Sequence, residues 1–218
     1  MKQIIAIDGP AGAGKSTVAK LLAKKLGYTY IDTGAMYRAV AWKTLRQHQG
    51  NVTEASILAA AKDIDVRLSC ADGKARVAVD GIDVTEEIRR PEVTEIVSRV
   101  AALGAVREQM VKMQRAMAAD GAVVMDGRDI ATNVLPNADV KIFLTASVEE
   151  RARRRYEEMQ AKGYSVDLDT LQRDISARDK QDSERTIAPL RQAEDAVLVD
   201  TTGMSIEEVA ARLFALCK

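Results

Sequence analysis

The sequence predicts an α/β protein with a parallel sheet, because short apolar runs alternate along it with longer segments of helical period. A glycine-rich segment, residues 9–17, joins the first apolar run to the first helical segment. That order of strand, glycine loop and helix is typical of phosphate-binding α/β proteins. The two observations together predict both the fold class and a nucleotide-binding site.

Five predicted strands and the helices between them form the expected core. The strands cover residues 4–7, 28–31, 122–125, 140–144 and 196–199. The first helix is expected to follow the glycine loop and to stop at Gly27. Further helices are predicted over residues 35–47, 91–117, 148–162, 168–185 and 206–216, with Gly104 as a point of interruption. Ser147 with Glu150, and Ser205 with Glu208, fit the capping box that begins a helix.

One segment interrupts the alternation. Residues 66–70 and 75–80 read as two short strands joined at Asp72-Gly73, and Ile82 and Val84 can extend the pairing. Because a hairpin does not belong to a doubly wound sheet, we expect residues 49–90 to form an appendage. It is either structural decoration or a part that helps to close over a substrate, and the sequence alone favours neither.

The glycine loop carries the most specific motif of the chain. It matches G-x-x-x-x-G-K-[ST], in which backbone N–H groups and a helix N-terminus cradle phosphate. A lysine at this place reaches the outer phosphates, and the hydroxyl that follows it can hold Mg²⁺. The residues expected to bind the phosphates are Gly9, Pro10, Ala11, Gly12, Ala13, Gly14, Lys15, Ser16 and Thr17.

Composition narrows the classes of partner. The chain has 218 residues with 32 basic and 32 acidic side chains, so no general attraction to nucleic acid or membrane is expected. The hydrophobic fraction of 47% suffices for a core, and no apolar stretch approaches membrane-spanning length. Cys70 and Cys217 suggest no disulfide framework, and the first residues do not read as a secretory signal. We therefore expect a cytoplasmic monomer that acts on small molecules and binds neither nucleic acid nor membrane.

A second acidic element ends the third predicted strand. Asp126 is placed to reach Mg²⁺ beside the loop, since ligands bind outside the carboxyl ends of parallel strands. Arg128 and Asp129 would add a cation and an acceptor at the same place. The alternative is an ordinary Asp-Gly turn.

Two charged stretches allow more than one interpretation. Leu171 and Ile175 share a helix face that continues into Arg178, Asp182 and Arg185, which favours a helix running from the core into an anion-binding cleft. The plainer alternative is an i,i+4 surface bridge between Arg178 and Asp182. The arginines at 151 and 153–155, interleaved with glutamates, are either a solvated helix face or part of a mobile lid that supplies cations to a transferring phosphoryl group.

Three motifs together resemble the bacterial cytidylate kinase family over almost the whole chain, appendage included. They are residues 32–38 (DTGAMYR), residues 126–129 (DGRD), and residues 177–179 (ARD) continued by Asp182 and Arg185. The resemblance implies the P-loop nucleoside monophosphate kinase fold, with ATP and Mg²⁺ as donor and metal and with transfer of the γ-phosphate to CMP or dCMP. It further implies a core at residues 1–33, 101–150 and 167–218, a monophosphate-binding region at 34–100 and a lid at 151–166.

The resemblance also implies roles for single residues. Lys15, Arg128 and Arg185 would be catalytic, and Ser16 and Asp126 would hold the metal. Arg38, Arg128 and Arg185 would grip the acceptor phosphate, where a guanidinium fork suits two oxygens. Arg178 and Asp182 would hold the ribose, and Ser98, Arg107 and Asp129 would read the cytosine edge. Thr33, where the family often has serine, completes the substrate-binding set.

Two other functions stay open at this point. One is a monophosphate kinase for another base, such as UMP, AMP or dTMP, against which the base-reading set of Ser98, Arg107 and Asp129 argues. The other is a P-loop switch protein that hydrolyses nucleotide; the chain lacks the Asn-Lys-x-Asp sequence that reads guanine.

Overall fold

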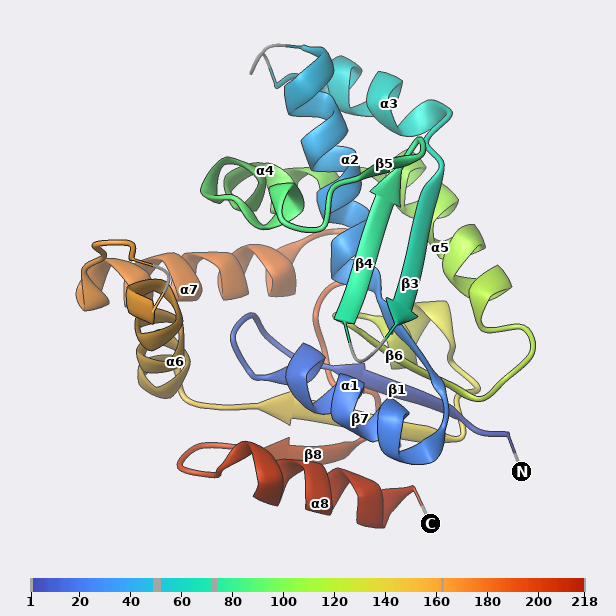
Figure 1. The fold of residues 1–218 in the computed structure, drawn as a ribbon, viewed down its shortest axis with the longest axis vertical. Coiled ribbons are helices and arrows are strands. Elements are labelled where there is room, and N and C mark those ends of the chain that lie inside the picture. The colour runs from blue at the N-terminus through green and yellow to red at the C-terminus, as the bar shows by residue number, and fades with distance from the viewer. Residues whose placement is uncertain (1, 49–51, 72–73, 162, 218) are drawn as a thin grey trace.

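The structure is a computed structural model that describes residues 2–48, 52–71, 74–161 and 163–217. Its core is a five-stranded parallel sheet in the order β2-β6-β1-β7-β8 (Figure 1). The predicted parallel sheet is confirmed, with each strand within two residues of its expected ends. The strands are β1 (Ile4–Asp8), β2 (Thr29–Asp32), β6 (Val123–Gly127), β7 (Val140–Thr145) and β8 (Val197–Asp200).

The helices follow the predicted periodicity with two differences, an unpredicted helix at Glu54–Lys62 and an earlier start of the helix after the second strand. The interruption expected at Gly104 is confirmed, because the extended backbone of Leu103 ends one helix before Gly104 begins the next. The second helix begins two residues earlier than predicted, because Asp32 caps it by accepting from Ala35 N at 2.9 Å. The helices are α1 (Lys15–Leu26), α2 (Thr33–Gln47), α3 (Glu54–Lys62), α4 (Pro91–Ala102), α5 (Gly104–Met117), α6 (Val148–Ala161), α7 (Leu168–Glu184) and α8 (Ile206–Leu216). The expected end of α6, residue 162, lies outside the described residues.

The two predicted capping boxes differ in outcome. The Ser205 box forms in full at the start of α8. At α6 only half forms: Glu150 N donates to Ser147 Oγ at 3.2 Å, whereas the Ser147 N–H donates to Thr202 Oγ1. The reciprocal half was predicted wrongly, because the Glu150 carboxylate is taken up by two arginines of its own helix, Arg153 and Arg154.

The predicted hairpin is present and belongs to a small three-stranded antiparallel sheet. Its strands are β3 (Val66–Ala71), β4 (Lys74–Val79) and β5 (Ile82–Asp83). The expected turn at Asp72-Gly73, and residues 49–51 of the expected appendage, lie outside the described residues. Val66, Val77 and Val79 are buried in one apolar cluster with α2, which attaches this sheet to the body of the molecule.

Alternation along β1 explains how the core sheet is covered on both faces. Ile5 and Ile7 are fully buried in a cluster with side chains of α1 and α8. Ala6, between them, belongs to a cluster on the opposite face with Met125 of β6. A strand buried on both faces reads as a continuous apolar run, which is why the sequence revealed it.

The strand register brings acidic residues to one edge of the sheet. Asp8, Asp32 and Asp126 stand at or next to the carboxyl ends of β1, β2 and β6, and Asp32 pairs in register with Asp126. The loop of residues 9–14 leaves β1 at this edge, and α6 and α7 lie side by side near it (Figure 1). No helix within the described residues combines the length and the apolar character needed to cross a bilayer.

Candidate nucleotide-binding site

The glycine loop has a backbone that other residues could not adopt. Gly9 has φ of 148°, and a Cβ there would lie 1.9 Å from the carbonyl oxygen of Leu144 in β7. Gly14 has φ of 85° and forms the N-cap of α1, with no side chain to fill the space in front of the helix. The loop therefore leaves its N–H groups and the helix N-terminus available to phosphate oxygens.

Lys15 is buried at the start of α1 without an acidic hydrogen-bond partner in the described residues. Its side chain is 5% exposed, and Nζ donates to the Pro10 carbonyl at 2.7 Å. Burial, together with repulsion from the nearby Arg128, lowers the pKa of Lys15 to about 7. The carboxylates of Asp126 and Asp8 act in the opposite direction. A buried lysine in this condition is stabilised by any anion that enters the loop.

Asp126 is the centre of a hydrogen-bond network that joins three elements. Its carboxylate accepts from Ser16 Oγ at 3.0 Å and from Tyr30 Oη at 2.7 Å, and its backbone carbonyl accepts from Thr33 Oγ1 at 2.7 Å. Burial, together with the nearby charge of Asp32, raises the pKa of Asp126 to about 6, although Lys15 acts in the opposite direction. The structure thus brings Ser16 and Asp126 together, as the sequence predicted for a metal pair.

The oxygen donors of this pair fit Mg²⁺. A hydroxyl and a carboxylate are hard ligands, and Mg²⁺ in phosphotransfer sites is held by one or two protein oxygens, by water and by substrate phosphates. Among the described residues no cluster of three His, Cys, Asp or Glu side chains could hold a metal without such help. Any Mg²⁺ here would therefore arrive with a nucleotide.

Asp8, at the end of β1, is a buried carboxylate that the sequence analysis did not select. Its two oxygens accept from the backbone N–H groups of Ile130 and Ala131, each at 2.8 Å. Burial raises the pKa of Asp8 to about 6, although these two hydrogen bonds act in the opposite direction.

A group of arginines gathers beside this carboxyl edge. Arg128 donates from Nε to Asp182 Oδ2 at 2.9 Å, so Asp182 forms an ion pair with a residue outside its own helix. Burial, followed by repulsion from Arg178, lowers the pKa of Arg38 to about 9. Burial, followed by repulsion from Arg128, likewise lowers the pKa of Arg178 to about 10. Mutually repelling, desolvated guanidiniums create a strong preference for an anion among them. The expected cleft is favoured over the plain surface bridge.

Arg38 is held in place by uncharged partners. Its Nη1 donates to the Ile88 carbonyl at 3.1 Å and to Thr94 Oγ1 at 2.8 Å. The guanidinium therefore keeps its full charge available to a ligand.

A third cluster surrounds Asp129. Its carboxylate pairs with Arg107, whose side chain is 3% exposed, and accepts from Arg185 Nη2 at 3.2 Å and from Asn133 Nδ2 at 3.0 Å. The guanidinium of Arg107 also lies 5.5 Å from the centre of the Tyr37 ring. This buried group, with two guanidiniums around one carboxylate, offers both hydrogen-bond donors and an acceptor to a polar ligand edge.

No hydrogen bond described in the structure joins the predicted residue Ser98 to these clusters. It lies half-buried on α4, a helix that packs against α7.

The arginine-rich stretch of α6 divides between the two interpretations given for it. Arg151 turns inward and bridges the glycine loop to α7, donating to the Ala11 carbonyl at 3.0 Å and pairing with Asp179 at 2.6 Å. Arg154 donates to the Thr201 carbonyl at 2.7 Å. Arg153 pairs with Glu150 and Glu157 on the outer face, as a solvated helix surface does. Sequence reasoning missed which arginines face the loop, although 151 and 154 share a helix face at i,i+3 spacing.

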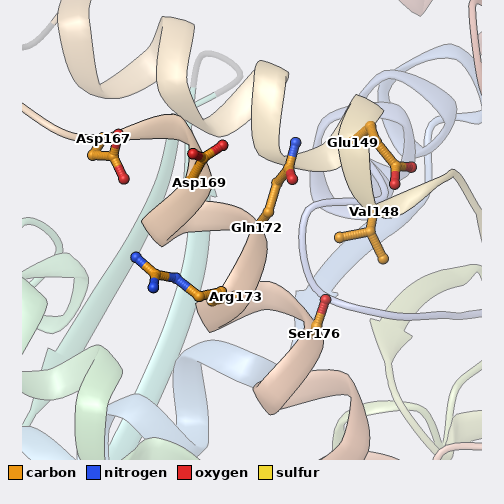
Figure 2. A pocket seen from close by; sticks show the side chains of 7 residues that line it. All are labelled: Val148, Glu149, Asp167, Asp169, Gln172, Arg173 and Ser176. Carbon is orange, nitrogen blue, oxygen red and sulfur yellow. The ribbon is translucent and has the colours of Figure 1, made fainter.

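An open pocket of about 710 Å³ is lined by residues at the start of α6 and along the first turns of α7 (Figure 2). Arg173 and Ser176 of α7 and Glu149 at the start of α6 are among the residues that line it. Its polar lining is largely exposed, and it contains none of the predicted site residues. The buried charges at the glycine loop, rather than this pocket, mark the candidate site.

Comparison with known proteins bears on the whole chain. The family model for cytidylate kinase matches residues 5–218. The chain is 54% identical over 215 residues to a cytidylate kinase of Bacillus velezensis, a match that covers 99% of this chain and 96% of the relative. It is 55% identical over 212 residues to a cytidylate kinase of a Geobacillus species, covering 97% and 95%.

Solved structures show likeness in fold alone. A shikimate kinase from Bacteroides thetaiotaomicron superposes with a TM-score of 0.50 at 15% identity, covering 99% of this chain and 98% of that one. An uncharacterised protein from Eubacterium ventriosum does so with a TM-score of 0.54 at 13% identity, covering 99% and 97%.

Proposed function

The chain belongs to the cytidylate kinase family, and from this premise we infer that it transfers the γ-phosphate of ATP to CMP or dCMP, giving ADP with CDP or dCDP. The observation that carries the proposal is the presence of two separate cationic clusters at one sheet edge. Lys15 lies in the glycine loop, and Arg38, Arg128 and Arg178 lie beside it. A protein that only hydrolysed nucleotide would need the first cluster and not the second.

The reaction needs little from the protein beyond placement and charge. The acceptor phosphate is already an anionic nucleophile near neutral pH, so no strong general base is required. Its oxygen attacks the γ-phosphorus of ATP, the bond to the β-phosphate oxygen breaks, and ADP leaves. Fixed cations that offset charge on the transferred group are the main catalytic contribution.

On the donor side we assign the loop of residues 9–17 to the ATP phosphates. Lys15 contacts the outer phosphates, and its pKa rises on binding because the phosphate charge opposes desolvation. Ser16 and Asp126 hold Mg²⁺, which neutralises charge on the β- and γ-phosphates when bound. Tyr30 orients Asp126 through a hydrogen bond to its carboxylate, and Thr33 does so through a hydrogen bond to its backbone carbonyl.

On the acceptor side we assign Arg38, Arg128 and Arg185 to the monophosphate of CMP, and Arg178 and Asp182 to the ribose. Although burial alone would raise it, Arg128 and Arg178 hold the pKa of Asp182 below its usual value, so it stays an acceptor for a ribose hydroxyl. Arg128, Arg178 and Asp182 lie close enough to influence one another, which supports a shared sugar-phosphate site.

We assign Ser98, Arg107 and Asp129 to the cytosine base. Cytosine presents an amino donor next to a ring-nitrogen and a carbonyl acceptor. A carboxylate facing the amino group and donors facing the acceptors would complement that edge. The Arg107–Asp129 pair supports the assignment, because it presents both kinds of group from one fixed unit.

We further propose the division of labour among segments. Residues 34–100 form the monophosphate-binding region with the β3-β4-β5 sheet, and residues 151–166 form a lid over the donor, with 1–33, 101–150 and 167–218 as core. Arg151 and Arg154 of the lid support this, since both reach groups next to the donor loop. We propose that the protein is cytoplasmic and binds neither nucleic acid nor membrane. We also propose that it is a monomer, and light scattering of the purified protein would test its oligomeric state.

The proposal is tested by an acceptor panel. Consumption of ATP in the presence of Mg²⁺ would be measured with CMP, dCMP, UMP, AMP and dTMP, each at the same concentration, and without acceptor. We expect CMP and dCMP to be the best acceptors and the rate without acceptor to be negligible. A better rate with another base, or equal consumption of ATP without any acceptor, would contradict the proposal.

A further inference from the structure

Asp8 connects the two halves of the proposed site. Its backbone ends β1 and directly precedes Gly9, the first residue of the donor loop. Its side chain is 2% exposed, and its two oxygens accept from Ile130 N and Ala131 N at 2.8 Å each. One residue is thus joined to the donor loop through its backbone and to the segment after β6 through its side chain.

The contact begins where strand pairing ends. Asp8 and Gly127 are the last register pair between β1 and β6. Arg128 and Asp129, the residues assigned to the acceptor, follow Gly127 in the chain, and the strand pairing with β1 does not extend to them. The Ile130 N–H belongs to the peptide bond that follows Asp129, so the hydrogen bond to Asp8 Oδ1 fixes the backbone orientation of Asp129 itself.

The geometry is that of a rigid two-point attachment. Two N–H donors, one to each oxygen of the carboxylate, fix its rotation as well as its position. A buried carboxylate is costly unless both of its oxygens are satisfied, and here it also satisfies two buried N–H groups that an apolar residue would leave without an acceptor. The presence of an aspartate at this position therefore indicates that the end of β1 must be aligned with the segment after β6, in addition to packing against it.

We propose that Asp8 is a positioning residue that keeps Arg128 and Asp129 in register with the donor loop, so that the acceptor phosphate lies in line with the γ-phosphate of ATP. This inference rests on the proposed function. Asp8 contacts the backbone of the acceptor segment and takes no part in the chemical step.

The discriminating variant is Asp8→Asn. The amide has nearly the same shape but offers one acceptor oxygen and turns an NH₂ donor toward the other N–H group. Because a displacement of about 1 Å can cost roughly a hundredfold in rate, we expect kcat/KM for CMP to fall by about ten- to a hundredfold. The Kd for ATP, measured without CMP, should stay within about twofold of the wild-type value, because the donor loop keeps its own backbone. Exchange of the Ile130 and Ala131 amide hydrogens should accelerate.

A control separates alignment from general destabilisation. Val209→Ala removes buried volume from the core between α1 and α8 and should lower the melting temperature without changing either nucleotide constant. Should Asp8→Asn fail to fold, Asp8→Glu keeps both acceptors but displaces them by one methylene, and the same split between CMP and ATP is expected from it.

Unchanged CMP kinetics in the substituted enzyme, or equal losses for CMP and ATP, would overturn the assignment. A wild-type chain that forms no CDP would contradict the proposed function and this inference with it. A wild-type chain that forms CDP beside a variant without the split would contradict this inference alone.

Discussion

Ser16 and Asp126, 110 residues apart in the sequence, are joined by a hydrogen bond of 3.0 Å from the hydroxyl to the carboxylate. The loop that would hold a triphosphate and the strand end that would hold a metal are therefore assembled before either ligand arrives. Tyr30 donates to the other oxygen of Asp126 and keeps the carboxylate from rotating away.

The first prediction concerns metal dependence. Asp126→Asn weakens the proposed Mg²⁺ site, so the Mg²⁺ concentration for half-maximal activity should rise by about tenfold or more, with a lower kcat. Activity measured against Mg²⁺ at fixed ATP checks this. Asp195→Asn, an exposed carboxylate paired with Lys141, is the charge-matched control. An unaltered Mg²⁺ dependence would remove Asp126 from the metal site.

The same substitution should stabilise the nucleotide-free protein. The pKa of Asp126 is raised by burial from 3.8 to about 6, so the folded state binds this proton more tightly than the unfolded state. Stability contributed by this group falls as pH rises between these two values and stays low above them. Without metal or nucleotide at pH 7.5, Asp126→Asn should therefore melt higher, by an amount on the order of 1 kcal/mol or about 2–4 °C. The advantage should vanish below about pH 4, and a lower melting point at pH 7.5 would argue against this account of the buried charge.

Lys15 should matter for turnover. Lys15→Ala removes a preorganised cation from the outer phosphates and should reduce kcat by roughly two to three powers of ten. Lys24→Ala, an exposed lysine of the same helix, should have no such effect. Steady-state kinetics at saturating ATP and CMP decide the matter, and normal turnover in the Lys15 variant would end its catalytic assignment.

Asp129 should matter for the choice of base. Asp129→Ala leaves Arg107 without its buried partner and removes the acceptor proposed for the cytosine amino group. The ratio of kcat/KM for CMP to that for UMP should fall by about tenfold or more, while ATP affinity changes less. Equal losses with every acceptor would show that Asp129 does not read the base.

Two arginines of α6 should behave differently despite being two residues apart. Arg151→Ala breaks the link between the Ala11 carbonyl and Asp179, and should raise the KM for ATP and lower kcat by about tenfold in total. Arg153 is 54% exposed and pairs only with glutamates of its own helix in the described residues, so Arg153→Ala should be nearly silent. Similar kinetics for both variants would disprove the division of this helix into inner and outer faces.

The sequence was informative wherever structure depends on neighbours along the chain. The core strands, the glycine loop and the break at Gly104 follow from local patterns of apolar residues and glycine. Helix α3 was not predicted, because its cap is a Thr53–Ser56 pair rather than the serine–glutamate pattern sought elsewhere. Its ends depend on a side-chain pair that short polar residues form in many turns as well.

The site was predictable in part for the same reason. Motifs placed Lys15, Ser16 and Asp126 correctly relative to one another, because the end of each parallel strand meets the same sheet edge. Asp8 and Tyr30 were missed, since their partners, Ile130 and Asp126, are set by strand register across the sheet. Which arginines of α6 face the loop depends on the rotation of that helix against α7, and periodicity does not fix that rotation.

The central claim is transfer of a phosphoryl group to a cytidine monophosphate, and following the label tests it most directly. The protein would be incubated with ATP labelled at the γ-phosphate, Mg²⁺ and an equimolar mixture of CMP, UMP and AMP, and the labelled products separated. The account predicts that the label appears in CDP before the other diphosphates and that little is released as inorganic phosphate. Label found mainly in inorganic phosphate, or mainly in UDP or ADP, would contradict it.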